Sequence, residues 1–176
     1  KPHAAATALQ DAIAAELAPR SSLLSRTGPI EEITAEELPL GISEIDEALP
    51  VGGEVVRERY PNRKVKIERH VVQDANENYQ NHGTWKMWDP EGNLLAVGNY
   101  VHNQRAGEWS RWYRPDDSKL FRTAPFDQFE SPYLSRADFQ ADQIHGVWTI
   151  VDSKKAKISE WNFVNGRRHG KSTWWY

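Results

Sequence analysis

His82-Gly83-Thr84-Trp85-Lys86-Met87-Trp88 is the stretch that decides the fold of this chain, because recognisable copies of it return three more times. The copies begin at Ala106, His145 and His169, and the second residue of each is a glycine. The four motif glycines, Gly83, Gly107, Gly146 and Gly170, follow one another in steps of 24, 39 and 24 residues. A period of 24 residues with one insertion of 15, the difference between 39 and 24, predicts a stacked array of similar units.

Turn signals precede the last three copies and predict β-hairpins. Seven residues before the motif glycine an aromatic residue recurs, and we expect it to end an incoming strand. Four residues before the glycine stands a residue type that tolerates positive φ, so each unit turns at the same place. The aromatic residues are Tyr100, Phe139 and Phe163, and the turn residues are Asn103, Asp142 and Gly166. In the first copy Asn76 occupies the aromatic position, so that turn has diverged.

The strand that follows each motif glycine carries large apolar residues on both faces. Side chains alternate between the faces of a strand with a period of two residues. This period places Trp85, Trp109 and Trp148 on one face of successive units. An odd offset of three residues places the next set on the opposite face: Trp88, Trp112, Val151 and Trp175. A further turn in each unit then leads to a second predicted strand, at Leu94, Leu120 and Ile158.

The chain divides near residue 50. Residues 4–18 are rich in alanine and repeat leucine or isoleucine every four residues until Pro19, which predicts a helix. From residue 51 valines and isoleucines alternate with charged residues, as in half-buried strands. We therefore expect an acidic, partly helical arm over residues 1–50 and a tryptophan-rich β-hairpin repeat domain over residues 51–176. The predicted fold is mainly β, with stacked antiparallel hairpins in an extended curved sheet.

Composition and charge restrict the classes of function. The chain has 176 residues, is 39% hydrophobic and contains no cysteine, which excludes disulfides and thiolate chemistry. Residues 1–56 hold 3 basic and 10 acidic side chains, whereas the remainder holds 19 basic and 15 acidic. This asymmetry favours either an acidic arm that docks on a basic neighbour or a merely solvated acidic tail. No apolar run is long enough to span a membrane, and the missing initial methionine slightly favours an extracytoplasmic location.

The order of an aromatic residue, a turn glycine, His-Gly, a tryptophan and a second aromatic residue is clearest in residues 163–175. It resembles the MORN-type repeats of the bacterial YwqK antitoxin-like family, over residues 55–176. The resemblance implies stacked antiparallel β-hairpins that form a long curved sheet. It also implies a role in binding protein or lipid instead of in catalysis.

Three histidines recur in register, at His82, His145 and His169. A metal or acid–base site needs unlike groups that converge, whereas residues repeated in register arise from duplication, so we interpret these histidines as structural. The turn carboxylates are interpreted as solvated turn residues for the same reason: Asp89, Asp116, Asp117 and Asp152. No phosphate-binding loop, nucleophile elbow or zinc-protease helix occurs. The sequence therefore predicts no catalytic residue, no metal site and no cofactor.

The insertion is predicted near residues 123–137, and it is rich in both aromatic residues and proline. Its aromatic residues Phe126, Phe129 and Tyr133 favour a partner interface, because loops with aromatic anchors commonly bind partners. The alternative is that the insertion folds back over a neighbouring hairpin. The tryptophans of the second face, Trp88, Trp112 and Trp175, complete the predicted partner-binding set.

These patterns favour a non-enzymatic protein-binding scaffold, an accessory subunit of a larger assembly. The alternative is an antitoxin-like inhibitor of one dedicated partner, and a weaker alternative is a carbohydrate- or lipid-binding surface. Contact with a membrane surface is a separate possibility that the sequence leaves open. Basic residues near aromatic residues are also typical of a surface for nucleic acid: Arg105, Arg111, Arg114, Arg167, Arg168 and Lys171. With 19 basic against 15 acidic residues after residue 56 and no compact basic run, nucleic acid ranks below protein.

Overall fold

The computed structural model describes residues 53–176, so the predicted arm over residues 1–50 lies outside the described residues. Residues 53–176 form one open antiparallel sheet of ten strands with two short 3-10 helices. The elements are β1 (Glu54–Arg59), β2 (Val65–Gln73), β3 (Tyr79–Trp88), β4 (Leu94–Val101), β5 (Gln104–Tyr113), η1 (Lys119–Arg122), η2 (Phe126–Gln128), β6 (Tyr133–Gln140), β7 (Gln143–Ile144), β8 (Gly146–Val151), β9 (Lys157–Val164) and β10 (Arg167–Trp174). The predicted mainly β, antiparallel hairpin architecture is confirmed.

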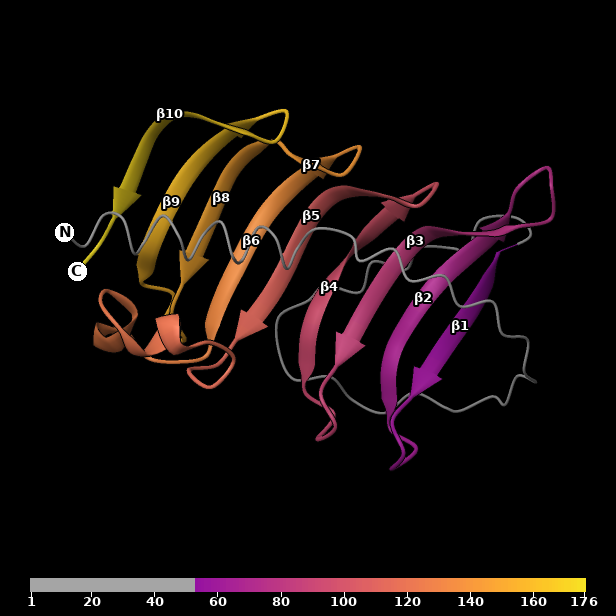
Figure 1. Ribbon diagram of the computed structural model, residues 1–176, viewed down its shortest axis with the longest axis horizontal. Helices are drawn as coiled ribbons and strands as arrows, with labels where there is room; N and C mark the ends of the chain where they lie inside the picture. The colour runs from indigo at the N-terminus through magenta and orange to yellow at the C-terminus, as the bar shows by residue number, and fades with distance from the viewer. Residues whose placement is uncertain (1–52) are drawn as a thin grey trace. The chain divides into compact units, whose positions relative to one another are not determined.

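Strands that are consecutive in the chain are neighbours in the sheet, in the order β1-β2-β3-β4-β5-β6-β8-β9-β10 (Figure 1). The short strand β7 pairs with the end of β6. Pairing is uneven, because β5 and β6 share seven residue pairs whereas β6 and β8 share three. The contact between β6 and β8, called the seam below, is formed by the pairs Leu134↔Val151, Ser135↔Ile150 and Arg136↔Thr149.

The tight turns between strands lie where the sequence predicts them. The second residues of three two-residue turns have positive φ: 65° at Asn103, 66° at Asp142 and 73° at Gly166. The first residue of each also has positive φ, which makes these turns type I′, the type whose twist matches a right-handed hairpin. The motif glycines have positive φ as well, 101° at Gly83 and 66° at Gly107, beside irregularities in the strand register.

Trp85, Trp109 and Trp148 lie on one face of the sheet, called the aromatic face, together with Phe139. The Trp85 and Trp109 rings are 5.5 Å apart at their centroids, and Trp109 meets Phe139 at 6.2 Å. Both buried indoles find acceptors: Trp109 Nε1 donates to the carbonyl of Asn99 at 3.1 Å, and Trp148 Nε1 to Ser135 Oγ at 2.7 Å.

Gly98 of β4 lies beneath the indole of Trp109. It pairs with Trp85 on β3, and a Cβ at this position would overlap the ring of Trp109. The strand therefore needs glycine here for close approach, and no turn is involved. This one missing side chain lets the two tryptophans pack together across β4.

The insertion differs from its predicted limits. Strand β6 begins at Tyr133, so the segment without strand structure runs from residue 114 to 132 instead of 123–137. Leu120, expected to start a strand, lies in η1, because Ser118 Oγ accepts a hydrogen bond from the Leu120 amide at 3.3 Å and caps this helix. In the repeat unit that begins at Ala106, the strand that follows β5 is therefore β6.

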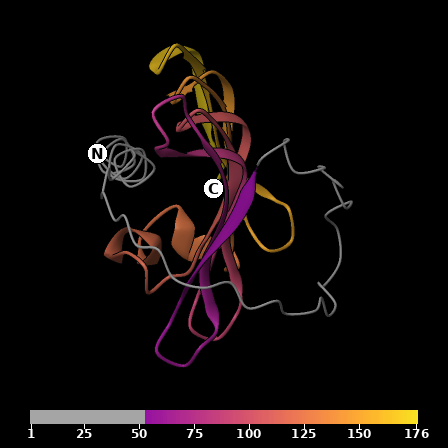
Figure 2. The ribbon, with the colours of Figure 1, turned by 90° about the vertical axis from the view of Figure 1, so that its right-hand side faces the viewer.

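The insertion folds back over the aromatic face, where Figure 2 shows η1 and η2 on one side of the sheet. Phe121 and Phe126 are 2% and 0% exposed. Their rings pack on Tyr113 of β5 and Tyr133 of β6, with centroid distances of 5.1 Å for both Phe121–Tyr113 and Phe126–Tyr133. Phe126 also meets Trp174 of β10 at 6.2 Å, so the insertion reaches from β5 across the seam to the last strand.

Candidate functional site

The face opposite the insertion presents a different surface, called the groove face and marked by Trp112, Leu134, Val147 and Val151. On β8 the alternate residues Trp148 and Ile150 are 1% and 0% exposed on the aromatic face. Val147 of the same strand is 44% exposed on the groove face. Side-chain alternation along one strand thus separates a packed face from an accessible one.

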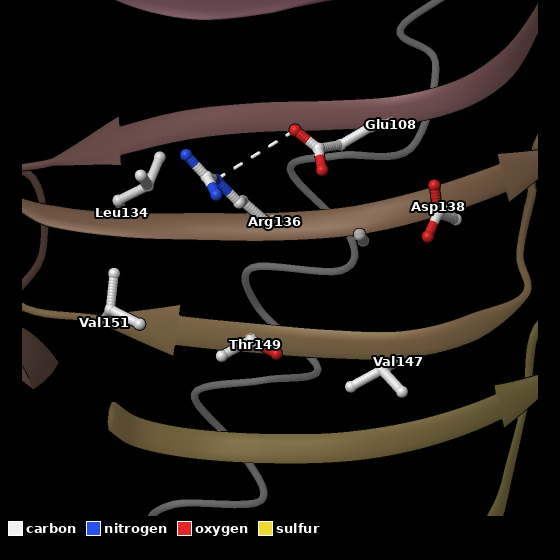
Figure 3. A pocket seen from close by; sticks show the side chains of 8 residues that line it. Glu108, Leu134, Arg136, Asp138, Val147, Thr149 and Val151 are labelled. Atoms are coloured by element: carbon white, nitrogen blue, oxygen red, sulfur yellow. Dashed lines mark ion pairs between the residues drawn. The ribbon is translucent and has the colours of Figure 1, made fainter. Parts of the chain in front are cut away.

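A shallow groove of ≈ 250 Å³ lies on this face along the seam (Figure 3). Its floor is formed by the short side chains of β8 and one from β6, and longer charged side chains stand beside it. The lining residues are Glu108, Leu134, Arg136, Ala137, Asp138, Val147, Thr149 and Val151. Sites for drug-sized molecules measure about 300 to 1,000 Å³ and enclose their ligand. The groove is smaller and open, so it suits one or two side chains of a protein partner.

Charges of both signs border this apolar strip. Arg136 Nε lies 4.0 Å from Glu108 Oε1, and both side chains are more than half exposed, at 57% and 62%. Such a pair contributes little to stability, because water screens it. Asp138 adds a further carboxylate at the end of the groove (Figure 3). An apolar centre with a charged rim is the usual composition of a protein interface.

The predicted partner-binding residues do not gather at one place. Phe126 and Tyr133 are 0% and 2% exposed inside the insertion cluster, so they offer no surface to a partner in this structure. Phe129 is half-buried, as are the tryptophans of the second set. Trp112 pairs with Leu134 beside the groove, whereas Trp88 ends β3 and Trp175 follows β10. Trp112 is the member of this set nearest the groove.

The groove residues Val147, Thr149 and Leu134 were not singled out from the sequence. The signal available was the alternation of β8, where two β-branched residues flank a buried Trp148. That pattern predicts an accessible face but does not predict a hollow. The hollow depends on which long side chains of β5 and β6 stand beside the short ones of β8.

The recurring histidines have separate surroundings. The rings of His82 and His102 are 4.7 Å apart, whereas the His145 amide donates to the Asp138 carbonyl at 2.8 Å and His169 is exposed on β10. Within residues 53–176 no three His, Asp or Glu side chains are placed to hold a metal ion. The predicted basic surface is also divided: Arg105 is buried against Asp142, and Arg114 binds Asp89.

The turn carboxylates divide into buried and exposed members. Asp89 and Asp152 are 5% and 6% exposed, which corrects the interpretation of these two as solvated. They are buried because each closes its own five-residue turn: Asp89 Oδ1 accepts from the Asn93 amide, and Asp152 Oδ1 from the Ala156 amide, both at 2.7 Å. Asp89 also accepts from Arg114 Nη2 at 2.8 Å, which joins two successive turns.

We expect Asp89 to make stability depend on pH. Burial by itself would raise its pKa, but hydrogen bonds from Asn93 and the charge of Arg114 hold the pKa below its ordinary value. A carboxyl whose folded pKa is depressed stabilises the protein above its unfolded pKa of about 4, and this contribution is lost as pH falls through the folded pKa. Chemical denaturation between pH 6 and about 2.5 should therefore give a flatter profile for Asp89→Asn than for the parent. Asp138→Asn on the exposed groove rim is the matched control, and a parallel profile for Asp89→Asn would contradict the role given to Asp89.

Among the described residues no helix is long and apolar enough to cross a membrane. No family model, curated protein or solved structure matches the chain.

Proposed function

We propose that the chain is a non-enzymatic protein-binding scaffold, an accessory subunit of a larger assembly, which receives its partner on the groove face. The observation that carries the proposal is the groove on the seam, with an apolar floor that includes the 44% exposed Val147. Exposed apolar surface rimmed by charge marks interaction sites on soluble proteins. Because the insertion packs on the aromatic face, the groove face is the one accessible to a partner.

The proposal takes the hairpins as repeats of the MORN type, with a period of 24 residues, like those of the YwqK-like family. Recurring backbone hydrogen bonds between successive hairpins support this reading. The amides of Asn103, Asp142 and Gly166 donate to the carbonyls of Asn81, Arg105 and Ile144, and each acceptor stands two residues before a motif glycine. Repeat proteins use such stacking to extend a continuous binding surface.

A sugar-binding surface built from the tryptophans of the aromatic face agrees less well with the structure. Stacking on sugar rings requires exposed indoles, whereas Trp109 and Trp148 are 7% and 1% exposed. The antitoxin-like alternative uses the same protein-binding surface and differs in the number of partners. Native affinity purification with mass spectrometry separates the two, because a dedicated inhibitor yields one stoichiometric partner and an accessory subunit yields a multi-protein particle.

The groove is tested by placing a charge in it. Val147→Arg should weaken partner capture about tenfold or more, because the long arginine side chain would fill the shallow groove and exclude the side chains of the partner. Val101→Arg is the matched control, since both valines are exposed to the same degree, 44% and 46%, and Val101 lies outside the groove. Both variants should melt at the parental temperature. A photo-crosslinking residue at position 149 should mark the same partner that the affinity purification recovers.

Equal capture by Val147→Arg and the parent would overturn the groove as the binding site. Equal crosslinking from positions 149 and 101 would do the same, because it would show contact without preference for the groove.

A further inference from the structure

The groove on the seam has an acidic end and an apolar end. Figure 3 shows Glu108 and Asp138 at the same end as Val147. Leu134 and Val151 line the other end. The two carboxylates stand on neighbouring strands, because Glu108 of β5 is directly paired with Asp138 of β6, and both residues are exposed. This end of the groove therefore places negative charge beside apolar surface.

The two carboxylates are incompletely neutralised by the rest of the lining. Like charges directly opposite one another destabilise a pair of strands. Arg136, the basic residue of the lining, has its Nε 4.0 Å from Glu108 Oε1, at the outer limit for an ion pair. Asp138 forms no ion pair with another residue of the described range 53–176. Two carboxylates thus share one guanidinium, which leaves room in charge for one further cation.

An exposed aliphatic side chain lies beside this charge. The ladder between β6 and β8 ends at Arg136↔Thr149, and two residues from this pair stand Asp138 on β6 and Val147 on β8. Val147 is 44% exposed. Lysine and arginine match such a surface, because their methylene stems cover apolar atoms while the charged head stays at a polar site. One such side chain also agrees with the small volume of the groove, ≈ 250 Å³.

The chain's own residues 1–56 match the acidic end poorly. They hold 10 acidic and 3 basic side chains, so this segment would bring further negative charge to Glu108 and Asp138. Juxtaposed like charges disfavour a contact. The acidic segment is therefore not the occupant that the charges of the groove select.

A second copy of the chain would offer Arg167, which is exposed on β10. A contact between the groove of one copy and β10 of the next joins two different surfaces. Contacts of this heterologous kind extend into filaments unless their rotation closes a ring. A different protein that supplies the basic side chain needs no such closure.

We propose that the groove binds a lysine or arginine of an extended partner segment. The stem of this side chain lies on Val147, and its charged head lies between Glu108 and Asp138. Charge-assisted hydrogen bonds to two carboxylates select a cationic side chain against a neutral one of the same shape. The inference rests on the proposed function, because it names the side chain that a protein partner places in the groove.

The probe is a short synthetic peptide of serine and valine with one central arginine. It is titrated into the isotope-labelled full chain while backbone amide resonances are recorded. Amides of residues 134–138 and 147–151 should shift. A peptide with citrulline, the neutral analogue of arginine, should bind about threefold to fivefold more weakly, the usual range for an exposed ion pair.

The combined variant Glu108→Gln/Asp138→Asn should remove the difference between the two peptides. Its matched control is Glu77→Gln/Glu91→Gln, which removes the same charge from two exposed turn residues outside the groove and should keep the difference. The combined variant should melt at the parental temperature or above it, because it removes a pair of opposed like charges. A merely structural role of the two carboxylates would lower that temperature.

Equal binding of the arginine and citrulline peptides would overturn the proposal, and so would the absence of shifts at millimolar peptide. Concentration-dependent self-association that the combined variant removes would assign the groove to a second copy instead. An intramolecular crosslink from a photo-crosslinking residue at position 149 to residues 1–52 would assign it to the chain's own segment. Either assignment would overturn the choice of another protein.

Failure of this inference is distinguishable from failure of the proposed function. If Val147→Arg loses partner capture and the combined variant retains it, the groove is the binding site but a basic side chain is not its ligand. If Val147→Arg captures the partner as the parent does, the groove itself is not the binding site.

Discussion

Trp109→Ala is expected to lower the free energy of unfolding by about 3 to 5 kcal/mol, the usual loss for truncating a buried tryptophan. Trp109 is 7% exposed and packs against Trp85, Tyr100 and Phe139 at centroid distances of 5.5, 5.1 and 6.2 Å. These three ring contacts reach β3, β4 and β6, so Trp109 joins its own strand to three others. Thermal unfolding should show a decrease in Tm of about 10 °C.

Trp112→Ala is the matched control, the same chemical change three residues along β5 on the half-buried groove face. Trp112→Ala should lower the free energy of unfolding clearly less than Trp109→Ala does. Gly98→Ala tests the same packing from below, since the added methyl group meets the indole of Trp109, and overpacking of this kind costs about 1 to 3 kcal/mol. A parental melting temperature for Trp109→Ala would show that the row is not part of the core.

Phe126→Ala should destabilise the protein by a similar amount, about 3 to 5 kcal/mol, because its ring is 0% exposed among three aromatic rings. Its backbone contributes as well: the Phe126 carbonyl accepts the Tyr133 hydroxyl at 2.9 Å, a bond that the substitution leaves in place. Partner capture by the folded fraction should be retained, since the groove lies on the other face. Denaturant titration and affinity purification at low temperature measure the two quantities.

The control for Phe126→Ala is Phe129→Ala, a half-buried phenylalanine three residues further along the insertion. If Phe126→Ala loses partner capture while its stability is unchanged, the insertion is a partner interface. A loss of stability with capture retained assigns it to the core.

Local rules predicted much of this fold. Turn residues with positive φ at Asn103 and Asp142 could be read from the sequence, because few residue types adopt that conformation. The common face of Trp85 and Trp109 followed from alternation along a strand. Both depend on residues close in sequence, where physical chemistry leaves few choices.

Features that depend on distant residues were not predicted. Gly98 has no turn signature, and its role appears only when Trp109 of the next strand lies over it. Leu120 was expected in a strand because nothing in its neighbourhood revealed that Phe121 would pack under Tyr113. The groove depends on the relative lengths of side chains on three strands, which no local pattern encodes.

The seam between β6 and β8 has a mechanical consequence. With three residue pairs it is the narrowest contact between successive long strands, so it is where a pulled or thermally agitated sheet should part first. On the aromatic face the insertion bridges the seam, because its rings contact Tyr113 of β5 on one side and, through Phe126, Trp174 of β10 on the other. On the opposite face the groove is lined by residues from both sides of the seam. A partner bound in the groove would bridge the seam from the groove face as well. Binding of a partner in the groove should therefore slow amide hydrogen exchange in β8, even where the partner contacts none of the β8 amides.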